Sequence, residues 1–309
     1  MMYWIRYAML TVSVFFLLYV VLSATLVVVW QWLRSQSRFD ADTLFTLRVL
    51  PLAGALLLVI LVTIPSFWSL EPSATDEGIS LPVATLFAAG AVWIMSRGVR
   101  IFASLRHASK FFALASPSPR LLEGAPQLAA YEFPGDGPNM FIAGLWRPRL
   151  LISQAAVELL DGQEMRAAIR HELAHAESSD NIKQVIVRFC AFPGLASLDR
   201  EWLRAAEIDA DDRAAIDELG AAELASALIK VGTASARLRV PELGMSLVPE
   251  ADAPVSARVQ RLLDWKPSKP DRGGHAAQLC LLLVPAGMVA FNLVWLMTQM
   301  HRFTEILFQ

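Results

Sequence analysis

Four long apolar stretches divide the chain. They run from Tyr7 to Leu33, from Val49 to Leu70, from Gly78 to Ser96 and from Ala276 to Met300, and none of them contains a charged residue. A bilayer core about 30 Å thick needs about 20 apolar residues of helix to cross it. The pattern therefore predicts four transmembrane helices, of which the third is the shortest.

Basic residues gather in two of the segments that flank these stretches. The second connecting loop carries only acidic charges. Because short basic loops stay in the cytoplasm, we expect the first loop and the region between the third and fourth stretches to be cytoplasmic, with both termini outside. This arrangement predicts a multi-pass protein of the inner (cytoplasmic) membrane. The basic residues are Arg34, Arg38 and Arg48 in the first loop, and Arg97, Arg100, Arg106 and Lys110 after the third stretch.

The region between the third and fourth stretches has mixed composition and the size of an ordinary domain. We expect three parts: residues 1–103 with three transmembrane helices, a cytoplasmic domain over 104–272, and residues 273–309 with the fourth helix and a short tail. Within the domain, "QLAAYEF", "NMFIAGL" and "RLLIS" are separated by turn-rich segments. They predict a small antiparallel sheet between about Leu128 and Ser153.

Helical patterns follow this sheet. Asp161 with Glu164 three residues later has the spacing of a capping box, which predicts a helix that begins there and ends near Asp180. Three more helices are predicted over about 181–192, 197–219 and 221–236. The domain is therefore expected to be α+β.

The composition indicates the class of protein and excludes some kinds of binding site. Hydrophobic residues make up 55% of the 309 residues and charged residues 18%, which is typical of a membrane protein. The net charge of -2 gives no basic field, so no direct binding of nucleic acid is expected. The two cysteines, Cys190 and Cys280, form no disulfide or metal-binding pattern.

The segment "IRHELAHAESSD" carries the chemistry. On a helix, His171 and His175 lie four residues apart on one face, and they can offer two imidazole nitrogens to one metal ion. Zinc accepts such ligands and keeps a position for water at catalytic sites. Glu172 lies at the edge of that face, where it could take a proton from the attacking water as general base. The pattern predicts a hydrolytic zinc site if a third ligand exists.

The third ligand is sought in "REWLRAAEIDADDRAA". For most of its acidic residues a solvated face is the simpler interpretation. Glu207 differs because its small neighbours permit close helix packing, and we predict it as the third ligand. Asp211 shares its face one turn later and could orient a ligand histidine by accepting its second ring N–H. Asp180 could do the same for the other histidine, or simply cap the following helix.

Three segments together resemble the BlaR/MecR family of membrane-bound zinc metallopeptidases. They are "FIAGLWRPRLLIS", "IRHELAHAESSDN" and "AAEIDADDRAA". The residues that match the motifs of that family are Gly144, Pro148, His171, Glu172, His175, Asp180, Glu207 and Asp211. The expected layout, with three spans, a cytoplasmic domain and a fourth span, is also similar to that family.

This resemblance implies a gluzincin-like fold with zinc as cofactor. It also implies that a substrate peptide lies along a sheet edge above the metal, where an edge strand can pair with an extended chain. The candidate edge strand is Phe141, Ile142, Ala143 and Gly144; an ordinary core strand is the alternative.

One departure from the family limits the functional hypothesis. Antibiotic-sensing members carry an extracellular penicillin-binding sensor after the fourth span, whereas here "HRFTEILFQ" follows Met300. A role as β-lactam receptor is therefore not expected.

Three functions stay open. The first is a membrane endopeptidase that cleaves a cytoplasmic protein such as a transcriptional repressor, in signalling by regulated proteolysis. The second is a quality-control protease of the HtpX type, and the third is a non-catalytic signalling or assembly component with a structural metal site. Expected partners are the protein substrate, the lipid bilayer, and a membrane sensor or a second copy of the chain.

Overall fold

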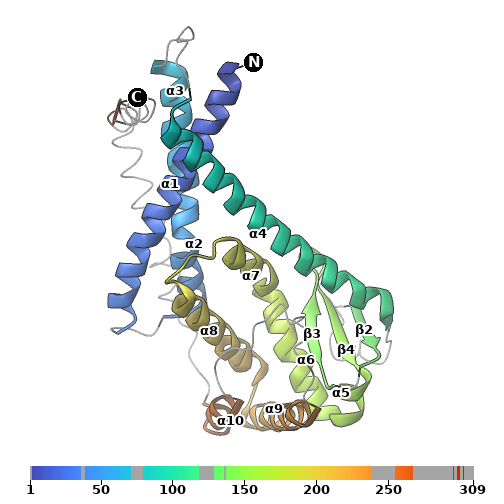
Figure 1. The fold of residues 1–309 in the computed structure, drawn as a ribbon. Coiled ribbons are helices and arrows are strands. Elements are labelled where there is room, and N and C mark those ends of the chain that lie inside the picture. The colour runs from blue at the N-terminus through green and yellow to red at the C-terminus, as the bar shows by residue number, and fades with distance from the viewer. Residues whose placement is uncertain are drawn as a thin grey trace. The chain divides into compact units, whose positions relative to one another are not determined.

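The computed structural model describes residues 2–35, 39–70, 79–117, 129–135, 137–238 and 255–266, with residues 295, 298, 299 and 302 (Figure 1). The chain divides into two compact units. The first, which we call the helix unit, contains Met1–Val99, Phe189–Leu198 and Arg272–Gln309. The second, the sheet unit, contains Arg100–Arg188 and Asp199–Asp271.

Long apolar helices build the helix unit. Three of the described helices are long and apolar enough to cross a membrane, which supports membrane association. They overlap the first three predicted spans with shifted ends, and the predicted fourth span over 276–300 falls outside the continuously described residues. The elements are α1 (Met2–Leu33), α2 (Ala41–Leu58), the π-helical turn η1 (Val59–Thr63), α3 (Ile64–Leu70) and α4 (Leu81–Leu114).

The predicted first loop is shorter than expected. Helix α2 begins at Ala41 because the Asp40 side chain accepts a hydrogen bond from Thr43 N and caps the helix. Arg48, expected in the loop, therefore lies inside α2, where it is fully buried. The basic residues expected after the third span likewise lie within α4, which continues to Leu114. The cytoplasmic orientation that these charges suggested stays a prediction.

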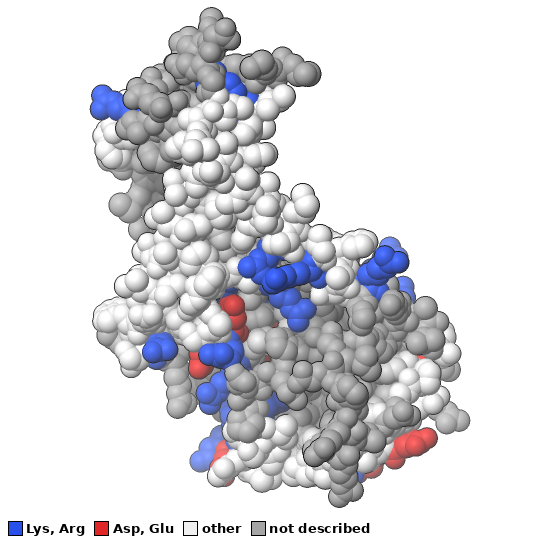
Figure 2. Space-filling model, in the orientation of Figure 1, with Lys and Arg blue, Asp and Glu red and all other residues white. Residues whose placement is uncertain are grey.

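Apolar contacts hold α1 against α2. Leu10, Val14 and Tyr19 of α1 are buried in one cluster with Ala55 and with Val59 of η1. The visible surface of this unit is mostly uncharged, as the white atoms in Figure 2 show. An apolar surface of this kind fits a lipid environment.

The sheet is mixed, and the prediction of a wholly antiparallel sheet was wrong. Its strand order is β1-β2-β4-β3, with β2 and β4 parallel and the other two pairs antiparallel. Strand β4 is almost completely buried, whereas β2 and β3 are partly exposed. The most buried strand therefore lies between β2 and β3 and separates them. The strands are β1 (Ser116–Pro117), β2 (Ala129–Phe133), β3 (Met140–Ala143) and β4 (Arg149–Ser153).

Six helices follow the sheet within the described residues. The predicted capping box of the motif helix is confirmed: the Asp161 side chain accepts from the Gln163 and Glu164 amides, and Glu164 accepts from the Asp161 amide. The next two helices end three and five residues earlier than predicted. The helices are α5 (Gln154–Leu159), α6 (Gly162–Glu177), α7 (Asp180–Phe189), α8 (Ala196–Ala214), α9 (Glu218–Leu238) and α10 (Val255–Leu263).

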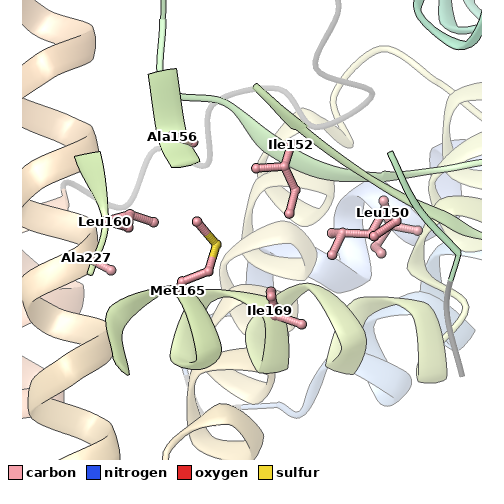
Figure 3. Packing of buried hydrophobic residues seen from close by; sticks show 9 residues of the cluster. Leu150, Ile152, Ala156, Leu160, Met165, Ile169 and Ala227 are labelled. Atoms are coloured by element: carbon pink, nitrogen blue, oxygen red, sulfur yellow. The ribbon is translucent and has the colours of Figure 1, made fainter. Parts of the chain in front are cut away.

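The main core of the sheet unit lies between the sheet and helix α6. Met165 and Ile169 point from α6 toward Leu150 and Ile152 of β4, with Ala227 of α9 beside them (Figure 3). Met165 and Ile169 are four residues apart and so lie on one face of the helix. Complete burial of a side chain of this size contributes about 1.5–3 kcal/mol. This packing fixes α6 against the sheet, and with it the histidines of the motif.

Candidate metal centre

Helix α6 brings the two motif histidines together. His171 and His175 are one turn apart, and their Nε2 atoms lie 3.2 Å from each other. His171 is buried and His175 is partly buried. The sheet packs against another face of α6, and the capping box lies at the start of the helix. The face that carries the two histidines can therefore form a site.

Helix α8 supplies the third side chain. Glu207 is buried, with its Oε2 atom 3.6 Å from His171 Nε2 and its Oε1 atom 3.6 Å from His175 Nε2. One ligand atom from each of the three residues lies within 4.8 Å of the other two. Two imidazole nitrogens and one carboxylate oxygen are a ligand set that zinc uses at catalytic sites. The residues present therefore fit a bound metal ion.

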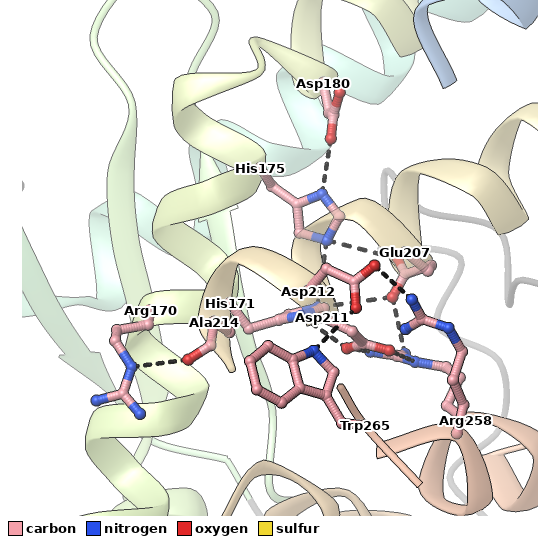
Figure 4. A network of polar contacts seen from close by, with 11 residues as sticks. Arg170, His171, His175, Asp180, Glu207, Asp211, Asp212, Ala214, Arg258 and Trp265 are labelled. Carbon is pink, nitrogen blue, oxygen red and sulfur yellow. Dashed lines mark hydrogen bonds and ion pairs between the residues drawn. The ribbon is translucent and has the colours of Figure 1, made fainter. Parts of the chain in front are cut away.

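Two aspartates contact the imidazole rings at their Nδ1 atoms, and the Nε2 atoms face the proposed metal position (Figure 4). Asp180 Oδ2 lies 2.7 Å from His175 Nδ1, and Asp211 Oδ1 lies 3.1 Å from His171 Nδ1. Carboxylates at Nδ1 hold the proton there and direct Nε2 toward a metal. For Asp180 the sequence permitted either this role or helix capping. In the structure Asp180 is the first residue of α7, and its side chain also contacts the His175 ring.

Arg258 of α10 completes the polar network, and sequence reasoning missed it. Its Nε and Nη2 atoms donate to the two carboxylate oxygens of Asp211, at 2.9 and 2.6 Å. Its Nη1 atom lies 2.7 Å from Glu207 Oε2. Arg258 and Arg261 are three residues apart, and the fold pairs them with the adjacent Asp211 and Asp212, a match that the sequence alone does not reveal.

These contacts shift the pKa values of the site. Burial alone would lower the pKa of His171, but hydrogen bonding to Asp211 and Glu207 outweighs it and raises the value to about 10. Burial would raise the pKa of Glu207, but His171 and Arg258 overcome this effect and lower it to about 2. The pKa of Asp211 also falls, because His171 and Arg258 outweigh its burial. The site is therefore built to keep both carboxylates charged.

Glu172 lies in a cavity with these residues. The cavity has a volume of about 290 Å³, and its lining includes His171, Glu172, His175 and Glu207. Burial raises the pKa of Glu172, although the two histidines oppose the shift. A carboxylate with a raised pKa is a better acceptor of a water proton near neutral pH. The chemistry of the cavity suits hydrolysis.

Comparison with known proteins agrees with this geometry. Residues 122–272 match the model of Peptidase family M48. The match supports a metal-dependent peptidase of the M48 type, and it includes both motif histidines, Glu207 and Arg258. The finer resemblance to the BlaR/MecR family is not confirmed. No curated protein matches the chain.

Within the residues that match this family model, strand β3 lies at an edge of the described sheet. Phe141 and Ile142 line the cavity, whereas Ala143 is fully buried. Gly144 follows with φ +102°, and a Cβ atom there would lie 2.6 Å from the Arg147 carbonyl oxygen. Only glycine fits this turn without strain. Of the four residues predicted as a substrate-binding edge, Phe141 and Ile142 thus line the cavity that contains the metal-ligand group, and the role of the edge stays a prediction.

Proposed function

We propose that the chain is a membrane-embedded, zinc-dependent endopeptidase. The observation that carries the proposal is the convergence of His171, His175 and Glu207, with ligand atoms within 4.8 Å, in a cavity that also contains Glu172. The match to Peptidase family M48 over this region supports the same reaction class. The three apolar helices support attachment to a membrane.

Each side chain has a defined part in the proposed hydrolysis. Glu172 accepts a proton from the attacking water and later delivers it to the leaving amine. Asp180 and Asp211 hold His175 and His171 in the orientation that presents Nε2. A zinc ion held by His171, His175 and Glu207 would supply Lewis acidity toward the scissile carbonyl. The edge strand β3 would align an extended peptide beside Glu172.

The proposed substrate is a protein in the cytoplasm, cleaved in regulated proteolysis, for example a transcriptional repressor. This part of the proposal rests on the motif resemblance and on the charge distribution around the spans. A membrane sensor or a second copy of the chain would supply the trigger. A multi-pass position in the inner membrane would then connect a signal in the bilayer to cleavage in the cytoplasm.

A quality-control protease with many substrates is the second candidate. It stays a candidate because the match to Peptidase family M48 is compatible with it and the resemblance to repressor-cleaving enzymes is unconfirmed. Comparison of protein levels in cells that carry the wild type or Glu172→Gln separates the two. One or a few stabilised proteins indicate regulated proteolysis, and many stabilised membrane proteins indicate quality control.

The first test measures zinc per chain in protein purified in detergent, for the wild type, Glu207→Ala and Glu172→Gln. We expect about one zinc per chain in the wild type and in Glu172→Gln, and clear loss in Glu207→Ala, because of these two glutamates only Glu207 is a proposed ligand. We also expect Glu172→Gln to lower peptide cleavage roughly 100-fold to 10,000-fold.

Three results would contradict the proposal in different ways. Absence of zinc from carefully purified wild type would refute the metallopeptidase assignment and favour a signalling or assembly component. Full zinc retention in Glu207→Ala would leave the metallopeptidase assignment intact but show that another group is the third ligand. Unchanged cleavage by Glu172→Gln would remove Glu172 as the base.

A further inference from the structure

The hydrogen-bonding groups of β3 face in two directions. The Asn139 carbonyl oxygen accepts from Ser153 N at 2.9 Å, so the backbone groups of Asn139 point toward β4. Backbone groups alternate in direction along a strand. Those of Met140 and Ile142 therefore point away from β4, toward the edge that has no further strand among the described residues. These outward groups are the ones that an added peptide strand would use.

A side chain of the protein already occupies part of this edge. Asn181 Nδ2 donates to the carbonyl oxygens of both Ile142, at 3.0 Å, and Gly144, at 3.2 Å. An amide N–H that donates to a strand carbonyl is the same chemical contact that a backbone amide of a substrate would make. Asn181 thus fills two acceptor positions of the edge.

These two acceptors lie next to the reactive groups. Asn181 and Ile142 line the same cavity as Glu172 and the proposed metal ligands. The Ile142 backbone amide also interacts favourably with the Glu172 carboxylate. Asn181 directly follows Asp180, whose carboxylate contacts His175. The occupied stretch of edge is therefore the stretch that a peptide must reach to place its bond beside Glu172.

We propose that Asn181 is an internal competitor for the substrate-pairing edge, which an extended peptide must displace before it can pair with Ile142 and Gly144. This inference rests on the proposed peptidase function and assigns to that site a residue that limits substrate binding. The exchange replaces a side-chain amide by a backbone amide, so the carbonyl oxygens keep a donor throughout. Asn181 would reduce the affinity for peptides without touching the metal.

The test uses full-length, zinc-loaded protein in detergent and two probes. Acetohydroxamate can bind the metal but has no peptide backbone, whereas N-acetyl-trialanine hydroxamate has the same metal-binding group and a backbone that can pair with the edge. Dissociation constants are measured for the wild type, Asn181→Ala and Asn181→Asp. Aspartate keeps the shape of the side chain but, when ionised, cannot donate. Asn139→Ala is the matched control, because the Asn139 amide contacts Gly137 and not the edge carbonyls of Ile142 and Gly144.

We expect both Asn181 variants to bind the tripeptide hydroxamate roughly tenfold more tightly than the wild type, the ratio that about one net hydrogen bond corresponds to. Acetohydroxamate binding should be unchanged in these variants, and Asn139→Ala should bind both probes like the wild type. Equal acetohydroxamate binding also shows that each variant is folded around its metal.

Other outcomes overturn the inference. Unchanged or weaker binding of the tripeptide hydroxamate, with acetohydroxamate unchanged, means that Asn181 supports the edge or plays no part in it. Failure of the zinc-loaded wild type to bind either hydroxamate would instead overturn the proposed function, and this inference with it. The two failures are therefore distinguishable.

Discussion

Arg258 joins two carboxylates that belong to different parts of the site. It forms a bidentate pair with Asp211, the carboxylate proposed to orient His171, and an ion pair with Glu207, the proposed ligand. All of these groups are largely buried, and the carboxylates raise the pKa of Arg258 against the effect of its burial. Removal of one member of a buried charge network leaves the others without compensation. The position should therefore be sensitive to substitution.

We predict that Arg258→Leu destabilises the metal-free protein more than the zinc-loaded protein. Without a metal, loss of Arg258 leaves Asp211 and Glu207 poorly compensated, at a cost of about 3 kcal/mol or more. A bound dication compensates Glu207, so the cost should be smaller with zinc. The measurement is thermal unfolding in detergent, followed by tryptophan fluorescence, with zinc or with a chelator.

Two further variants calibrate this prediction. Arg258→Lys keeps the charge but loses the planar fork, so an intermediate loss is expected. Arg261→Leu is the matched control, because Arg261 lies on the same helix and pairs with Asp212 outside the metal-ligand group. Its effect should be smaller and the same with and without zinc. An equal loss for Arg258→Leu in both states would contradict the proposed compensation.

For single residues, local spacing in the sequence predicted those site residues that share one helix face. It missed those that distant segments of the chain contribute. His171, His175 and Glu172 follow from one turn of helix, and the spacing of Glu207 and Asp211 follows from another. Arg258 approaches from a helix 47 residues after Asp211, and Asn181 contacts a strand 39 residues before it. No local pattern encodes contacts of that separation.

Among the elements, the start of α6 combines local and long-range contacts. Glu164 completes the capping box and also accepts from Ser226 Oγ and Lys230 Nζ of α9, both at 2.6 Å. Its burial opposes ionisation, but these donors outweigh burial and lower its pKa. The same carboxylate therefore stabilises the helix that carries the histidines and ties it to α9.

We predict that Glu164→Gln lowers the free energy of unfolding by about 1–3 kcal/mol at pH 7. Because the folded pKa of Glu164 is lowered, its charged form stabilises the protein above the unfolded pKa of about 4.3. This stabilisation is lost as the pH falls through the folded pKa, so the difference between variant and wild type should shrink below about pH 4.

Thermal unfolding between pH 3 and pH 7 checks this expectation. Glu158→Gln on the neighbouring helix α5 is the control, because Glu158 is exposed, and it should change little at any pH. A deficit for Glu164→Gln that stays constant down to pH 3 would show that lost packing, and not lost charge, is responsible.

The elements also show where prediction from sequence ends. Helix α6 carries its own start signal, and its predicted beginning at Asp161 agrees with the structure. The sheet order could not be read in the same way, because strand pairing joins segments that are distant in the chain. Strand β4 lies between β2 and β3, although β3 precedes it in sequence. The burial of β4 explains this order only after the whole sheet is known.

At the scale of the whole molecule, the short segment between α7 and α8 belongs to a different unit from most of these two helices. The segment Phe189–Leu198, which we call the connector, joins α7 to α8 but belongs to the helix unit. The Cys190 carbonyl oxygen accepts from Tyr19 of α1 and, at 2.6 Å, from Arg48 Nη2 of α2. The Ala191 carbonyl oxygen accepts from Arg97 Nη2 of α4 at 3.0 Å. Side chains from three apolar helices thus hold the connector.

The buried position of Arg48 explains why its predicted place in the first loop was wrong. The count of basic residues in loops assumes that an arginine near the end of an apolar stretch lies outside it. Arg48 instead donates to a carbonyl group 142 residues later in the chain. Charged side chains within membrane helices are rare and usually have a specific partner. The partner became visible only with the fold.

We predict that Arg48→Leu loosens the connector. The substitution removes a charged donor from the buried Cys190 carbonyl oxygen, and a bond of this kind contributes about 1.5–3 kcal/mol. We expect a lower Tm for the full-length protein in detergent and faster chymotrypsin cleavage after Phe192. Cleavage at Phe192 assigns the effect to the connector and separates it from a general loss of stability.

Arg48→Lys should recover part of the loss, because lysine keeps one charged donor but lacks the fork of arginine. Arg34→Leu is the matched control, since Arg34 follows the end of α1 and is exposed, and it should alter neither the Tm nor the cleavage rate. If Arg48→Leu lowers the Tm without any new cleavage near Phe192, then Arg48 stabilises the packing of the apolar helices and not the connector. If neither readout changes, the buried hydrogen bond contributes little and other donors hold the connector in place.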